Sequence, residues 1–134
     1  MRKSNVYYVI TIFSVLIMSA SWIFNLGWYR FVLIFIPIPL IHTIAFLIIN
    51  IKCANRISDF KCLGKYILIS SVTYLLPHLL FPDGGDIGGM YLFFGLIKND
   101  AIAYVMMPIA IIAFVINIIV LIIEGKIMRK CKKT

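Results

Sequence analysis

The chain has 134 residues, of which 63% are hydrophobic and 13% are charged, and its formal net charge is +8. Soluble domains carry about 25% charged residues. This composition therefore excludes an ordinary soluble domain and indicates a protein that is dissolved in lipid.

Four uncharged apolar segments follow one another along the chain. They cover residues 6–24, 31–51, 66–82 and 101–123. A hydrocarbon core about 30 Å thick is crossed by about 20 helical residues, with a tolerated range of about 17 to 25. Strands of a membrane barrel would alternate between apolar and polar residues, and these segments do not. We therefore predict an all-α membrane protein, a single integral domain in which four transmembrane helices form an antiparallel bundle.

The first segment also has some features of a signal peptide. A basic start, MRKSN, precedes it, and the small residues of MSASW resemble a cleavage site. Its apolar run exceeds the about 7 to 15 residues of a signal-peptide core. We expect a retained helix, with cleavage as the alternative, and the orientation of the other three helices is the same in both cases.

The positions of the basic residues predict the orientation. Of the 13 lysines and arginines, all except Arg30 and Lys98 precede the first segment, separate the second from the third, or follow the fourth. Loops rich in Lys and Arg stay in the cytoplasm. We therefore expect both termini in the cytoplasm, in a bacterial cytoplasmic (inner) membrane. Contact with anionic headgroups explains the net charge, and without interleaved aromatic residues the basic segments do not indicate nucleic-acid binding.

Three polar residues inside the apolar segments are candidate functional groups, because intramembrane polar residues are costly. They are His42, His78 and Asn117. The helix rise places His42 and Asn117 at similar depths, where a hydrogen bond between helices would help to specify packing. The four segments contain no Asp, Glu, Lys or Arg. We therefore favour a packing role for His42 and Asn117 over a proton relay, and we expect His78 to lie nearer the outer end of its helix, where water can reach it.

Prolines interrupt three of the segments and predict kinks or breaks, since proline lacks the amide donor. They are Pro37, Pro39, Pro77, Pro82 and Pro108. All five lie toward the ends that we expect to face outside. We therefore expect the outer half of the bundle to be irregular.

The external loop, residues 83–100, is the most polar stretch outside the basic segments. It begins with the turn-forming residues Asp83, Gly84, Gly85 and Asp86. The apolar stretch MYLFFGLI that follows is too short to span, so we expect an interfacial or re-entrant segment. The aspartates lack the ligand pattern of a calcium loop. A turn with an interfacial anchor is the simpler interpretation, and the four residues are candidates for binding a partner.

No motif indicates catalysis. The chain lacks H-E-x-x-H and G-x-S-x-G. The spacing of Cys53, Cys62 and Cys131 provides neither a C-x-x-C pair nor a metal-ligand pair. We predict no enzyme activity, no metal and no cofactor. The leading hypothesis is a protein that binds another membrane component, as a helper subunit or immunity-type protein does; the alternative is an oligomeric transporter or channel for small solutes or ions.

Overall fold

The structure is a computed structural model that describes residues 3–25, 27–58, 60, 62–84 and 89–130, with the backbone alone at 3, 28, 34 and 130. Within these residues the elements in chain order are α1 (Lys3–Phe24), α2 (Trp28–Ile34), α3 (Ile38–Asn55), α4 (Cys62–Leu80), β1 (Tyr91–Leu92), β2 (Ile97–Lys98) and α5 (Asp100–Lys130).

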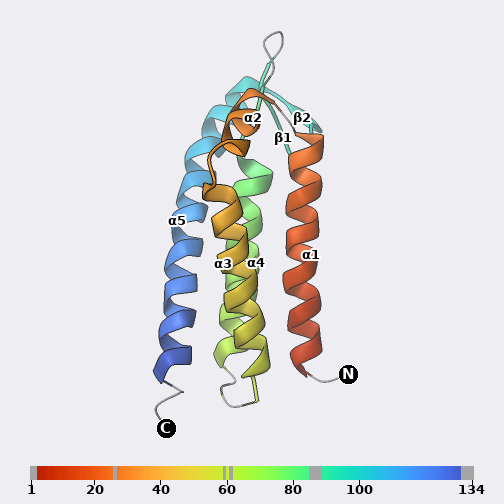
Figure 1. Cartoon of the computed structure of the whole chain (residues 1–134). Coiled ribbons are helices and arrows are strands. Elements are labelled where there is room, and N and C mark those ends of the chain that lie inside the picture. Colours follow the sequence, from red (N-terminus) through yellow and green to blue (C-terminus); the bar gives the residue numbers. More distant parts are fainter. Residues whose placement is uncertain (1–2, 26, 59, 61, 85–88, 131–134) are drawn as a thin grey trace.

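Four of the helices, α1, α3, α4 and α5, are long and apolar enough to cross a membrane. They pack side by side with alternating direction, and the start of α1 lies at the same end of the bundle as the end of α5 (Figure 1). The predicted all-α bundle of four long apolar helices is confirmed. We call the end at which α1 starts and α5 finishes the terminal end, and the opposite end the cap end.

Helix α4 is the central helix of the bundle. It packs against α1, α3 and α5. Half of its apolar span is buried, compared with 17% of the span in α1. The other helices therefore surround α4 and turn most of their side chains outward.

The distribution of side chains is reversed relative to a soluble protein. Large apolar side chains such as Phe13, Leu16 and Ile112 are exposed. The buried side chains include many polar ones: Thr11, Ser14, Ser21, Asn25, Arg30, His42, Thr43, Asn50, Ser70, Ser71, His78, Asp83, Asn117 and Glu124. Hydrocarbon as the solvent explains this reversal, because polar groups in lipid must find partners inside the bundle.

The second predicted segment, residues 31–51, is divided into two helices. Helix α2 ends at Ile34, and α3 begins at Ile38 directly after Pro37. Proline removes an amide donor and disfavours helical geometry in the residue before it. Helix α2 consequently lies at the cap end and does not extend α3 (Figure 1). Pro77 and Pro108, in contrast, lie inside α4 and α5.

The apolar stretch after the glycines forms a small hairpin. Strand β1 pairs with β2 in an antiparallel register, Tyr91 opposite Lys98 and Leu92 opposite Ile97. Pairing of the strands satisfies backbone groups that an isolated short segment would leave open. An interfacial position for this stretch stays a prediction. Helix α5 then continues to Lys130, beyond the expected end at residue 123, and so includes Glu124.

Candidate functional site: the cap and the polar interior

The carboxylate of Asp83 binds the first turn of α2. It accepts hydrogen bonds of 3.0 Å from the backbone amides of Gly27, Tyr29 and Arg30. It also accepts a hydrogen bond of 2.9 Å from the backbone amide of Gly84. The first amides of a helix have no partner within the helix. Asp83 therefore caps α2 from a segment more than 50 positions away in the sequence.

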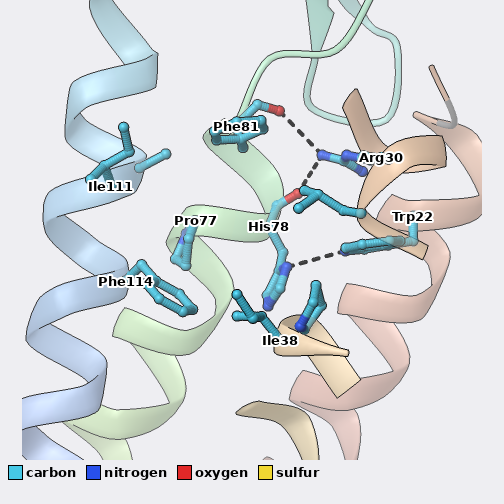
Figure 2. Close-up of a pocket in the computed structure, with 11 residues that line it drawn as sticks. Trp22, Arg30, Ile38, Pro77, His78, Phe81, Ile111 and Phe114 are labelled. Carbon is cyan, nitrogen blue, oxygen red and sulfur yellow. Dashed lines mark hydrogen bonds between the residues drawn. The ribbon is translucent and has the colours of Figure 1, made fainter. Parts of the chain in front are cut away.

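The side chain of Arg30 donates hydrogen bonds to backbone oxygens at the ends of α1 and α4. Its Nη1 donates to the backbone oxygen of Ser21 at 2.5 Å, and its Nη2 donates to the backbone oxygens of His78 (2.8 Å) and Phe81 (3.2 Å). The oxygens of Ser21 and His78 belong to the last turns of α1 and α4. The oxygen of Ser21 also accepts from the backbone amide of Asn25 (3.0 Å), and that of His78 accepts from the hydroxyl of Ser21 (2.7 Å). One guanidinium thus contacts the ends of two helices, and Figure 2 shows its bonds to His78 and Phe81 at the end of α4.

Arg30 and Asp83 also form a buried ion pair. The Nε of Arg30 lies 3.8 Å from Oδ2 of Asp83, and the two side chains are 2% and 0% exposed. Burial lowers the pKa of Arg30 to about 10, and the charge of Asp83 opposes that shift. Arg30 is therefore charged at neutral pH. Its charge offsets the cost of burying the carboxylate.

The same aspartate connects α2 to the hairpin. The backbone amide of Asp83 donates to the backbone oxygen of Tyr91 at 2.8 Å. The backbone amide of Tyr91 donates to the backbone oxygen of Asp83 at 2.7 Å. Gly27 lies so close to this segment that a Cβ at position 27 would overlap Oδ1 of Asp83. We call α2, residues 81–84 and the hairpin β1–β2 together the cap.

The structure describes two of the four predicted partner-binding residues, Asp83 and Gly84. Asp83 is fully buried and serves the cap, and Gly84 continues the same segment. Gly85 and Asp86 lie outside the described residues. Partner binding by these four residues stays a prediction, but the described contacts give the carboxylate of Asp83 a structural role.

The turn of the hairpin is one of the partly exposed segments of the cap. Phe93, Phe94 and Gly95 adopt positive φ angles of 55°, 61° and 74°. The turn is fixed to the bundle by a bond from the amide of Phe93 to the oxygen of Leu79. Leu96, which follows, is 78% exposed. The turn therefore lies against the ends of α1 and α4 and exposes one apolar side chain strongly, that of Leu96.

Two of the predicted polar residues meet inside the bundle. Nε2 of His42 lies 2.8 Å from Oδ1 of Asn117. The amide nitrogen of Asn117 donates to the backbone oxygen of Ser70 (2.7 Å) and to Oγ1 of Thr73 (2.9 Å). Asn117 thus connects α3, α4 and α5 at mid-depth, as expected of polar groups that specify packing.

His78 lies one layer closer to the cap. Its Nδ1 accepts a hydrogen bond of 3.2 Å from Nε1 of Trp22, and its ring centroid is 6.1 Å from that of His42. Its Nε2 has no hydrogen-bond partner among the described residues. The ring borders an apolar pocket of about 250 Å³ into which Ile111 and Phe114 of α5 project (Figure 2).

Sequence reasoning missed Glu124. Its side chain is fully buried in the terminal-end half of α5, and neither carboxylate oxygen has a hydrogen-bond partner among the described residues. Asn117 and Glu124 are seven residues apart, so both face the interior on one side of the helix. The spacing from Asn117 could have indicated a buried position for Glu124, but the predicted helix ended one residue before it.

No family model, curated protein or solved structure matches the chain. The function is therefore inferred from the geometry of the cap and of the polar interior.

Proposed function

We propose that this chain is a small multi-pass protein of a bacterial cytoplasmic membrane that binds another membrane component through its cap. Both termini face the cytoplasm and the cap faces outside, since basic residues concentrate at the terminal end. Its activity is binding and does not involve catalysis.

The single observation that carries this proposal is the anchored hairpin of the cap, whose turn exposes Leu96. A buried ion pair and six hydrogen bonds in which Asp83 and Tyr91 take part hold its base. The turn keeps two phenylalanines in the left-handed region, which costs about 1–3 kcal/mol at each such residue. Strain that is maintained by surrounding structure is typical of recognition sites. The exposed Leu96 beside this turn is the first expected contact.

Site-specific photo-crosslinking in living cells tests the proposal. A photoreactive residue at Leu96 should give a discrete protein adduct, whereas one at Leu16 should not. Leu16 is the matched control because it is also an exposed leucine, but it lies on the lipid-facing surface of α1. No adduct at 96, or equal adducts at both positions, would refute binding through the cap.

The polar interior supports a second candidate function, an oligomeric transporter or channel. His78, His42 and Asn117 follow one another from the cap end inward, and the buried Glu124 extends the series toward the terminal end. Intramembrane ionisable groups are typical of ion pathways. In vesicles loaded with a pH-sensitive dye, the protein should dissipate a proton gradient, and Glu124→Gln should abolish this. Vesicles that hold the gradient with the unaltered protein would exclude proton transport.

A further inference from the structure

A groove between α3 and α5 contains no residue of the cap, and it adjoins the pocket beside His78, with which it shares Ile38 and Phe114. It has a volume of about 510 Å³. Apolar side chains line most of it, among them Ile41, Ala45, Phe114, Ile118 and Ile122. Two cations, Lys126 and Arg129, border its terminal end.

The length of the groove fits one lipid chain. From Phe114 to Arg129, helix α5 rises about 22 Å at about 1.5 Å per residue. One leaflet of the hydrocarbon core is about 15 Å deep, half of about 30 Å. An acyl chain that starts at the level of Lys126 and Arg129 would therefore remain within the groove along its whole length.

The charges at the end of the groove fit the headgroup of such a lipid. Lys126 and Arg129 are exposed, and three positions apart they lie on one face of α5. Among the described residues, neither forms a salt bridge. Basic pockets between membrane helices at the headgroup level bind anionic lipids.

A glycine opens the groove below these cations. Gly125 lines the groove next to Lys126, and a Cβ placed on it would meet no atom within 4 Å. A side chain at this position would therefore begin in open space, with no neighbour for its Cβ to displace. Gly125 is therefore a position at which the groove can be filled selectively.

We propose that this groove is a binding site for an anionic phospholipid, with one acyl chain between α3 and α5 and the phosphate bound by Lys126 and Arg129. This lipid site requires only that the bundle is inserted in a membrane. Failure of partner binding through the cap would leave this site unaffected.

Native mass spectrometry of the purified full-length protein tests the proposal. The protein is titrated with dioleoyl phosphatidylglycerol and with dioleoyl phosphatidylcholine, which share their acyl chains and differ in charge. We expect tighter binding of phosphatidylglycerol. The double variant Lys126→Gln/Arg129→Gln should lose about 30-fold in affinity for that lipid, since each basic residue near a membrane surface contributes about fivefold.

Two further variants separate the site from general surface charge. Lys52→Gln/Lys65→Gln removes two exposed cations at the same end of the bundle that do not line the groove, and should change the affinity less than about twofold. Gly125→Leu should weaken the binding of both lipids, because the leucine side chain would fill the groove. Equal binding of the two lipids by the unaltered protein, equal losses in the two double variants, or unchanged binding by Gly125→Leu would each overturn the proposal. Unfolding temperatures of all variants verify that they are folded.

Discussion

Asp83 and Arg30 show how two residues can organise one end of a membrane protein. Asp83 caps the start of α2, and Arg30 caps the ends of α1 and α4. Their separation of 53 positions explains why the sequence did not reveal the pair. Asp83 is typical of a turn and Arg30 of a loop between helices, and only the folded chain brings the two together.

Removal of either partner should destabilise the cap strongly. Arg30→Gln and Asp83→Asn should each lower the free energy of unfolding by about 3–5 kcal/mol, because one buried charge is left without its counter-charge. The double variant should lose less than the sum of the two single variants. Unfolding of the purified protein in detergent measures all three. Additive losses would show that the two charges act independently.

The close contact at Gly27 gives a second prediction at this scale. A Cβ at Gly27 would overlap Oδ1 of Asp83 and lie 2.7 Å from the backbone oxygen of Gly84. Gly27→Ala should therefore lower the free energy of unfolding by about 1–3 kcal/mol through overpacking. Gly125→Ala is the matched control, since nothing lies within 4 Å of its Cβ and alanine favours helix. Equal stability of the two variants, measured by thermal unfolding, would contradict the close contact between position 27 and Asp83.

At the scale of the elements, length and hydropathy were sufficient to predict the four long helices. A helix satisfies its own backbone groups, so each one can be recognised locally. The break before Ile38 was foreseeable as a proline effect, but the separate helix α2 depends on Asp83. The hairpin depends on the pairing of Asp83 with Tyr91. Contacts between distant segments leave no local pattern in the sequence.

The contact between α3 and α5 is open to a direct test. His42→Leu and Asn117→Leu each remove one partner of the bond between Nε2 and Oδ1. A double-mutant cycle should give a coupling energy of about 0.6–2 kcal/mol, the range for hydrogen bonds between membrane helices. Unfolding in detergent measures the cycle. A coupling energy near zero would mean that the two side chains do not interact.

At the scale of the whole molecule, the apolar exterior and polar interior form one arrangement. The exposed side chains of α1, α3 and α5 are suited to lipid, while the polar side chains are concentrated around α4. Composition alone was sufficient to predict this class of protein. The position of Glu124 was missed because its helix extends past the last uncharged residue, into the basic segment at the terminal end.

The most direct test of the four-span arrangement is its topology in intact cells. Single cysteines are introduced at Leu96 and at Ser58, in a background with Cys53→Ala, Cys62→Ser and Cys131→Ser. Leu96 is exposed at the cap end, and Ser58 is exposed between α3 and α4 at the terminal end. A membrane-impermeant maleimide should label position 96 in intact cells and position 58 only after lysis. Labelling of position 58 in intact cells, or of both positions alike, would contradict a four-span bundle with its termini in the cytoplasm.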